Sequence, residues 1–216
     1  MWKKILALIK SDTDSRTAVF SAGMFFITLL FAVYNGLLGL HYMSLWHGSI
    51  GIYYVLLSLI RVYILLSEKH IQKHGINMAQ RRRNAFLVSS IILFVINISM
   101  IVPTILMVRF EKPMGMTLIP ALVIAVYTTI KVILAIMQIK KRTESSNPLI
   151  RELWTINDVD AALSVISLQN TLIMVAGDPS DRNLFILSAV TSGIIIIATI
   201  VMEIFFFVKE MKRQLI

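Results

Sequence analysis

Six apolar runs, each close to the length that a helix needs to cross a bilayer, follow one another along this chain. They cover residues 17–43, 49–67, 84–108, 116–139, 157–176 and 183–208. About 20 predominantly apolar residues span the hydrocarbon core of a membrane. Six such spans in 216 residues leave only short connections and no room for a separate soluble domain. We therefore predict an all-α membrane protein with six transmembrane helices.

The charge of the chain fits this class once its placement is considered. Only 15% of residues are charged and 57% are hydrophobic, against roughly 25% and 45–50% in soluble domains. The net charge of +9 would suggest nucleic acid in a soluble protein. Here the basic residues gather in particular loops, so we predict no nucleic-acid partner.

The distribution of lysine and arginine predicts the orientation. Sixteen of them lie in the N-terminal segment, the second and fourth loops and the C-terminal segment. The other three loops hold only Arg109, Lys112 and Arg182. By the positive-inside rule both termini are expected in the cytoplasm. The cluster at Lys69, Arg81, Arg82 and Arg83 is also expected to contact anionic lipids.

Two short segments are predicted to lie on the membrane surface. Residues 1–16 place Trp2 and Ile5 on a helical face opposite lysines, which is typical of a cytoplasmic amphipathic helix. In residues 148–154, Asn147 can cap and Pro148 can open a second interfacial helix. Four of its side chains are expected to face lipid: Leu149, Ile150, Leu153 and Trp154.

The two halves of the chain share three weak matches in the same order. FAVYN (31–35) matches IAVYT (124–128), the pair LW recurs at 45–46 and 153–154, and NAFLVS (84–89) matches NLFILS (183–188). Three spans separate the copies, so equivalent helices cross in opposite directions. This predicts an inverted 3+3 repeat, residues 17–112 and 113–216, although coincidence between apolar sequences is the alternative.

Polar residues fall on one side of each predicted helix at 100° per residue. Asn157, Asp160, Ser164, Ser167 and Thr171 form such a stripe on the fifth span. Small polar groups often stabilise helix packing through interhelical hydrogen bonds. The alternative is a polar mid-membrane lining, for which the candidates are Asn35, Ser58, Asn97, Ser164, Ser167 and Asn170. Gln169 lies opposite the Asp160 stripe, which suggests contact with a neighbouring helix or a homo-oligomer.

Four of the charged residues within the spans are the candidates, all predicted in the cytoplasmic third: Arg61, Lys131, Asp160 and Glu203. Charged groups inside a membrane are expensive and by default indicate function. One interpretation is that Arg61 and Lys131 snorkel to the surface, while Asp160 lies in the first turn of its helix behind caps at Thr155 and Asn157. The other is that Arg61 pairs with Asp160 or Glu203 at the floor of a cytoplasm-facing cavity.

Chemistry that marks membrane enzymes is missing from the sequence. It contains no HExxH zinc motif, no GxSxG nucleophile elbow and no cysteine. His70 and His74 have metal-binding spacing, but solvated interfacial histidines beside lysines explain them better. We therefore predict no catalytic residues, no metal site, no cofactor and no enzymatic activity.

Three runs carry a family resemblance: FAVYNGLLGLHYMSLWHGSIGIYYVLLSLIRVYILL, KVILAIMQIKKRTESSNPLI and LWTINDVDAALSVISLQNTLI. They resemble an uncharacterised family of small six-helix bacterial integral membrane proteins. The matching residues are Asn35, Gly36, Trp46, Gly48, Tyr54, Ser58, Arg61, Tyr127, Lys131, Pro148, Asn157, Asp160, Ala161, Ser164 and Gln169. The resemblance implies a multi-pass protein of the bacterial inner membrane, without implying an activity.

A second, fainter similarity is carried by AVFSA (18–22) and by the size and helix number of the chain. It is to the substrate-capture subunits of energy-coupling-factor vitamin transporters. The first external loop is shorter than the substrate-capping loop that this similarity implies.

Two function classes follow from these observations. The first is transport, as a channel, carrier or solute-capture protein, of a small polar solute or ion through a polar cavity between two three-helix halves. The second is a non-transporting scaffold, immunity factor or sensor that acts through other membrane proteins.

Overall fold

The structure is a computed structural model that describes residues 13–74, 77–110, 117–138, 145–176 and 182–213. All regular secondary structure in these ranges is helical. The helices are α2 (Thr13–His41), α3 (Leu45–His74), α4 (Met78–Ser99), α5 (Ile101–Phe110), α6 (Leu118–Gln138), α7 (Pro148–Ala176) and α8 (Arg182–Arg213). The amphipathic helix predicted over 1–16 lies almost wholly outside the described residues.

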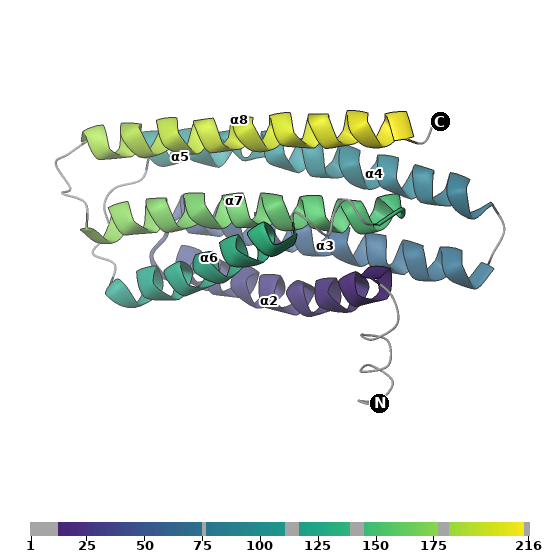
Figure 1. Cartoon of the computed structure of the whole chain (residues 1–216). Helices are drawn as coiled ribbons and strands as arrows, with labels where there is room; N and C mark the ends of the chain where they lie inside the picture. The colour runs from purple at the N-terminus through teal and green to yellow at the C-terminus, as the bar shows by residue number, and fades with distance from the viewer. Residues whose placement is uncertain (1–12, 75–76, 111–116, 139–144, 177–181, 214–216) are drawn as a thin grey trace.

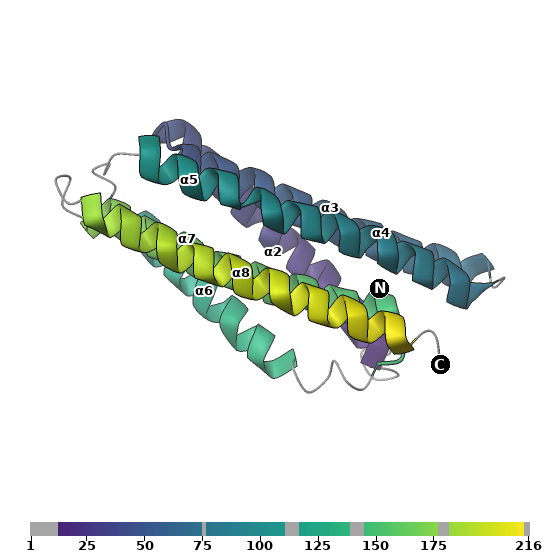
Figure 2. The ribbon, with the colours of Figure 1, turned by 90° about the horizontal axis from the view of Figure 1, so that it is seen from above.

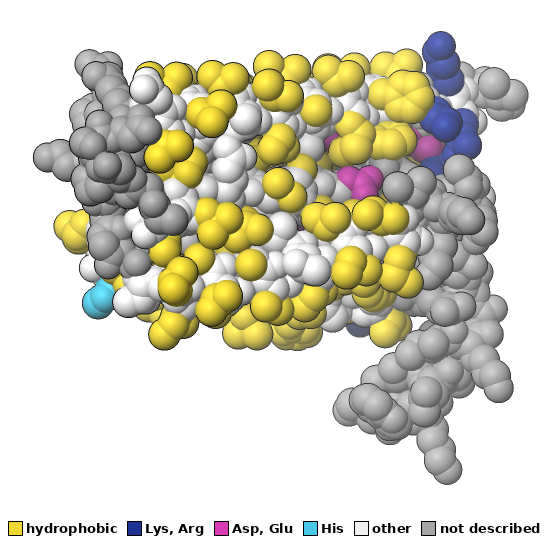
Figure 3. Space-filling view, turned by 60° about the vertical axis from the view of Figure 1, so that its left-hand side comes forward, with side chains coloured by type: hydrophobic (Ala, Val, Ile, Leu, Met, Phe, Trp, Pro, Cys, Tyr) yellow, Lys and Arg dark blue, Asp and Glu magenta, His cyan; other side chains and the backbone are white. Residues whose placement is uncertain are grey.

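Within the described residues, six helical spans are long and apolar enough to cross a membrane, with α4 and α5 together forming the third. Large apolar side chains cover the outside of the bundle, and Figure 3 shows them spread over one face. Leu30, Leu40 and Ile52 are 71%, 75% and 65% exposed, for example. Such a surface is stable only against lipid. The protein is therefore a six-helix membrane protein, as the sequence predicts.

The helices form two layers of three that face each other. In Figure 1, α8 lies with α4 and α5, α7 lies with α3, and α6 lies with α2. Viewed from above in Figure 2, α3, α4 and α5 run along one side, and α6, α7 and α8 along the other. We group α2 with the first layer because it packs mainly against α3, although in Figure 2 it runs obliquely from α3 toward the other layer. The first three spans thus form one layer and the last three form the other.

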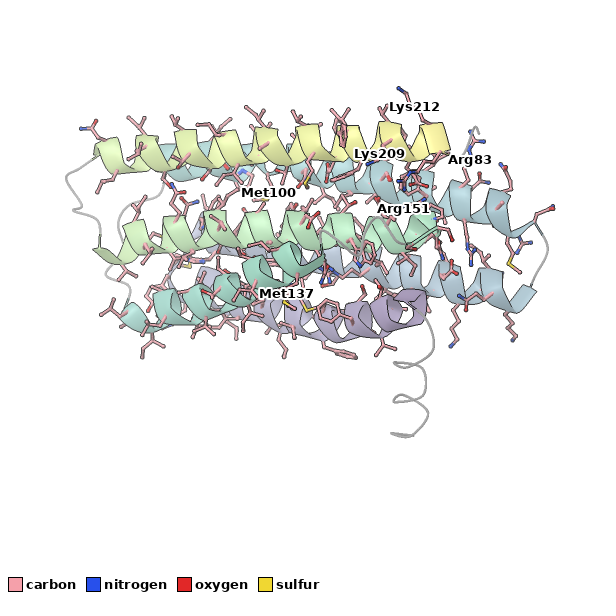
Figure 4. The ribbon with its side chains drawn as sticks, viewed as in Figure 1. Arg83, Met100, Met137, Arg151, Lys209 and Lys212 are labelled. Carbon is pink, nitrogen blue, oxygen red and sulfur yellow. The ribbon has the colours of Figure 1, made fainter. Side chains whose placement is uncertain are left out.

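One end of the bundle carries most of the positive charge. The first residues of α2 and the last residues of α8 lie at this end. Arg83, Arg151, Lys209 and Lys212 gather there as well (Figure 4). We call it the basic end.

Two helices occupy the centre of the bundle. In the most apolar windows of α7 and α3, 56% and 50% of residues are buried, against 22% in α8. α7 packs against α2, α3, α4, α6 and α8. Gln169 of α7 faces α8 and bonds to Ser188 at 3.3 Å. The two polar faces of α7 therefore need no second subunit to cover them.

The third span is interrupted at Met100, between α4 and α5. Pro103 has no backbone N–H, so the helical bond from residue 103 to the carbonyl of Ser99 cannot form. The N–H of Met100 instead bonds to the carbonyl of Asn97 at 3.2 Å, which tightens the turn. The break follows from one proline inside an otherwise apolar run.

The predicted interfacial helix at 148–154 is wrong as a separate element, because these residues are the first turns of α7. Its four supposed lipid-facing side chains are 0–2% exposed: Leu149, Ile150, Leu153 and Trp154. The capping prediction is confirmed, since Asn147 Oδ1 accepts the N–H of Leu149 at 3.0 Å. Likewise α3 continues to His74 instead of ending at 67. A hydropathy reading stops at charged residues, whereas a helix can continue past them.

Glycines let α2 and α3 approach closely near the end opposite the basic end. A Cβ on Gly39 would lie 2.6 Å from the backbone N of Gly48, and one on Gly51 would lie 3.0 Å from the N of Gly36. Met43, in the turn between these helices, has φ of 51°. The first two spans are therefore a hairpin whose backbones touch.

Candidate functional site

Asp160 on α7 lies at the centre of a buried ionic cluster. Arg61 on α3 donates from Nη2 to Asp160 Oδ2 at 2.7 Å, and Lys131 on α6 donates from Nζ to the same oxygen. The side chains of Arg61 and Asp160 are 0% exposed and that of Lys131 is 2% exposed. Neither cation snorkels, so that interpretation of the sequence is wrong.

Two hydroxyl groups complete the cluster. Thr28 Oγ1 on α2 donates to Asp160 Oδ2 at 3.1 Å and accepts from Lys131 Nζ at 3.0 Å. Tyr127 Oη donates to Asp160 Oδ1 at 3.1 Å, and Lys131 Nζ lies 5.0 Å from the centre of its ring. We call these five residues, Thr28, Arg61, Tyr127, Lys131 and Asp160, the Asp160 cluster. They come from both layers, so the cluster lies on the interface between them.

The Asp160 cluster is unbalanced in charge. Two cations share one carboxylate, and Arg61 Nε and Nη1 have no hydrogen-bond partner among the described residues. A buried donor without a partner costs about 1–3 kcal/mol, and more when it is charged. The arrangement can accept a further negative or hydrogen-bonding group beside the guanidinium.

Asp160 lies deeper in its helix than the sequence suggests. α7 begins at Pro148, so at 1.5 Å per residue Asp160 is about 18 Å from the start of the helix. Thr155 and Asn157 lie inside α7 and cap nothing: Thr155 Oγ1 bonds to the carbonyl of Arg151 and Asn157 Nδ2 to Gln138 Oε1. The predicted placement of Asp160 in the first turn is wrong, because that prediction began the helix at 157.

Glu203 does not join the other three predicted charges. Its Oε1 accepts from Asn97 Nδ2, and Asn97 Oδ1 accepts from the hydroxyl of Tyr53. This chain of contacts again crosses the two layers, from α8 through α4 to α3. Glu203 Oε2 is buried and has no partner in the described part of the protein.

Aromatic rings occupy the space between the Asp160 cluster and the Glu203 chain. Tyr53 and Tyr54 are consecutive on α3, with ring centres 6.5 Å apart. The ring of Tyr54 lies 5.9 Å from that of Tyr127, which itself stacks on Phe31 at 3.6 Å. Tyrosines therefore connect the two charged groups across the centre of the bundle.

The six residues predicted as a mid-membrane lining are all buried, at 0–4% exposure. Only Asn97 belongs to either charged group. Asn35 bonds to the carbonyl of Phe31 at 2.9 Å and contacts His47 Nδ1 at 3.2 Å. Asn170 Oδ1 accepts from Ser188 of α8. The side-chain amides of these asparagines therefore mainly form hydrogen bonds between neighbouring helices.

Two of the three serines predicted in the lining donate hydrogen bonds within their own helices. Ser58 and Ser164 donate to carbonyls of their own helices, at 2.8 and 2.7 Å. Ser167 Oγ is buried and makes no hydrogen bond within the described ranges. The six residues therefore do not converge on one cavity.

Among the described residues, three pockets lie toward the basic end, lined mainly by α4, α7 and α8, with α6 contributing to one of them. The largest, about 590 Å³, is the Arg83 pocket, lined by Gln80, Arg82, Arg83, Ser145, Arg151 and Arg213 among others. The Asp158 pocket, about 420 Å³, includes Phe86, Ile136, Asp158, Met202, Phe206 and Lys209. The Glu203 pocket, about 230 Å³, includes Ser90, Phe94, Glu152, Thr155, Glu203 and Phe207.

The pockets are adjacent, because they share residues. The Arg83 and Asp158 pockets share Arg151 and Glu210, and the Asp158 and Glu203 pockets share Glu152 and Thr155. Arg61, Lys131 and Asp160 line none of the three. The expectation that Arg61 forms the floor of a cavity is therefore not met by these pockets, which reach Glu203 instead.

Several acidic residues at this end were missed by sequence reasoning. Glu152 accepts a hydrogen bond from Ser90 at 2.9 Å, and Glu210 pairs with Arg151 at 2.5 Å. Glu68 pairs with Arg82, so this arginine, predicted to contact lipid, is already bound within the protein. In the sequence, these residues could have been found only by continuing the helical periodicity past the ends of the apolar runs. No group of three or more potential metal ligands occurs among the residues that the structure describes.

Comparison of the chain with protein-family models, with curated proteins and with solved structures finds no match.

Proposed function

We propose that this protein transports a small polar solute or ion across the membrane, along the interface between its two three-helix layers. The observation that supports this most is the location of the buried charge. The Asp160 cluster and the Glu203 chain both draw residues from the two layers. Ionisable groups at membrane depth by default mark a pathway for ions or solutes.

The arrangement of the layers supports an inverted repeat. Each layer has the same order, α2, α3, α4–α5 in one and α6, α7, α8 in the other, and the equivalent helices run in opposite directions (Figure 1). In an inverted repeat, a pseudo-two-fold axis in the membrane plane relates the two halves. Transporters built this way hold their solute where the repeats meet. Opening one end and then the other requires the layers to rock about that interface.

The proposed orientation places the basic end in the cytoplasm, in keeping with the positive-inside rule. The three pockets then face the cytoplasmic side. In this arrangement Glu203 is reached first and the Asp160 cluster lies deeper.

The burial of the Asp160 cluster favours one competing function. Because Arg61, Lys131 and Asp160 line none of the three pockets, the cluster could serve only to fix the packing of the two layers. Buried polar networks do specify unique packing in some proteins. The protein would then be a scaffold, immunity factor or sensor that works through other membrane proteins.

Reconstitution into liposomes distinguishes the two functions. Transient currents are recorded on supported membranes while amines, amino acids, organic acids and inorganic ions are added in turn. Transport predicts a current with at least one solute that is absent from empty liposomes and lost in Asp160→Asn. A matched control, Lys73→Met on the exposed part of α3, is expected to keep the current. The absence of a current with every solute would favour the non-transporting function.

A further inference from the structure

The Glu203 pocket is an acidic pocket inside a bundle whose overall charge is positive. Glu152 and Glu203 both line it, together with the hydroxyl-bearing Ser90 and Thr155. No lysine or arginine is among the residues that form it. An acidic lining of this kind favours a positively charged occupant.

The remaining wall of the pocket is apolar and partly aromatic. It consists of Ile91, Leu93, Phe94, Ile204, Phe206 and Phe207. Aromatic ring faces attract cations, most strongly where water is excluded. Ligand pockets in general combine a mostly apolar wall with a few polar groups that fix orientation. This wall suits a cation that carries a hydrophobic group, whereas it suits a hydrated metal ion poorly.

Glu203 provides the second observation that points to a ligand. Its side chain is 7% exposed, and Oε2 lacks a hydrogen-bond partner in the described structure while Oε1 is bonded to Asn97. Two other buried carboxylates toward the basic end have an arginine: Glu68 pairs with Arg82 and Glu210 with Arg151. Glu203 has no such cation among the described residues, although it is buried as deeply.

The pocket is open on the side that faces the membrane. Ile91 and Ile204, which belong to its wall, are 59% and 48% exposed on the lipid-covered surface. α8 also runs alongside α5 and diverges from α4 toward the basic end (Figure 1). A molecule that partitions into the inner leaflet can therefore enter from the bilayer without crossing the arginines of the Arg83 pocket.

We propose that the Glu203 pocket binds a lipophilic organic cation, an amine or quaternary ammonium that carries an aromatic or branched aliphatic group. The charged nitrogen lies against the carboxylate of Glu203, and the apolar group lies among Phe94, Phe206 and Phe207. This assignment names the substrate class of the site and rests on the proposed function. A lipid acyl chain also fits the apolar wall, but it offers no counter-charge to Glu203, whose Oε2 has no hydrogen-bond partner among the described residues.

Equilibrium binding tests the assignment without any need for transport. Benzyltrimethylammonium is titrated into the purified full-length protein in a non-ionic detergent, and heat is recorded by calorimetry. Neopentylbenzene, which has the same shape without the charge, is the matched ligand control. We expect one saturable site for the cation and at least about tenfold weaker binding of the neutral compound, since a buried charge pair carries the difference.

Variants locate the site. Glu203→Gln keeps the volume and the acceptor for Asn97, and it is expected to weaken cation binding by about tenfold or more. Glu152→Gln is a second variant in the same pocket and is expected to weaken binding as well, should Glu203→Gln fail to fold. Glu210→Gln is the control, because Glu210 is paired with Arg151 and lies outside the pocket. Its binding is expected to stay within about twofold of the parent.

Three results would overturn the assignment: no saturable binding beyond that of empty micelles, unchanged binding in both pocket variants, or equal binding of the neutral compound. The last identifies an acyl-chain groove. Failure of the proposed function looks different. Cation binding without any current refutes transport alone, whereas currents with other solutes and no cation binding refute only the substrate class.

Discussion

The unequal charges of the Asp160 cluster predict that its members contribute to stability by very different amounts. Asp160 neutralises two cations and accepts hydrogen bonds from Thr28 and Tyr127. In Asp160→Asn two buried cations remain without a counter-charge. Removing one partner from a buried ion pair costs about 3–5 kcal/mol. We expect a loss of unfolding free energy in this range.

Lys131→Met is expected to behave differently. It leaves Arg61 and Asp160 as a pair with no net charge, in place of a cluster with one excess positive charge. Hydrophobic replacement of buried ions is often neutral or stabilising, whereas the lost contacts to Thr28 and Tyr127 act in the other direction. We therefore expect the unfolding free energy of this variant to lie within about 1 kcal/mol of the parent.

The double variant tests the physical reason directly. Combining Asp160→Asn with Lys131→Met restores the single excess positive charge of the parent cluster. The double variant is therefore expected to lose less unfolding free energy than the sum of the two single variants, by about 0.5–3 kcal/mol. Unfolding is measured in mixed micelles by tryptophan fluorescence, because Trp46 and Trp154 are 0% and 2% exposed. Lys73→Met on exposed α3 is the control. Additive losses, or a loss in Lys131→Met as large as in Asp160→Asn, would refute the electrostatic reasoning.

Three further predictions follow from the helix contacts and the topology. Gly39→Ala places a Cβ 2.6 Å from the backbone of Gly48, whereas a Cβ at Gly193 meets open space. In thermal melting in detergent, Gly39→Ala is expected to lose about 1–3 kcal/mol of unfolding free energy and Gly193→Ala none. Equal melting of the two variants would contradict the close helix contact. Cysteines introduced singly at Met43 and Lys73, in a chain without any other cysteine, are expected to react with an impermeant maleimide in intact cells only at position 43; the reverse pattern would invert the proposed topology. Asn147→Ala removes the N-cap of α7 and is expected to cost about 1 kcal/mol in the same melting assay, and an unchanged melting temperature would mean that the cap is replaced.

The apolar runs predicted the class and the number of spans, because lipid imposes the same length and composition on every helix that crosses it. Helix ends were less predictable. α3 and α7 both extend past the apolar runs, where Glu68 and Glu152 are satisfied by Arg82 and Ser90. Such contacts depend on which helices are neighbours, and hydropathy contains no information about that.

The four intramembrane charges were identifiable from the sequence, since a charged residue in an apolar run needs a partner. Which partner each one meets was decided by the tertiary structure. Arg61 and Lys131 converge on Asp160 because α3, α6 and α7 bring them to one level of the bundle. Glu203, on the outer helix α8, meets Asn97 and the pocket instead.

The sequence by itself therefore determined that the chain has six helical spans suited to a membrane and that they contain charged residues. Only the packing of the two layers decided where the pockets lie, which carboxylate is left with an unbonded oxygen and which side chains once expected to face lipid are buried. The physical reason is that hydropathy is a local property of each segment, whereas ion pairs and pockets arise between segments that are far apart in the chain.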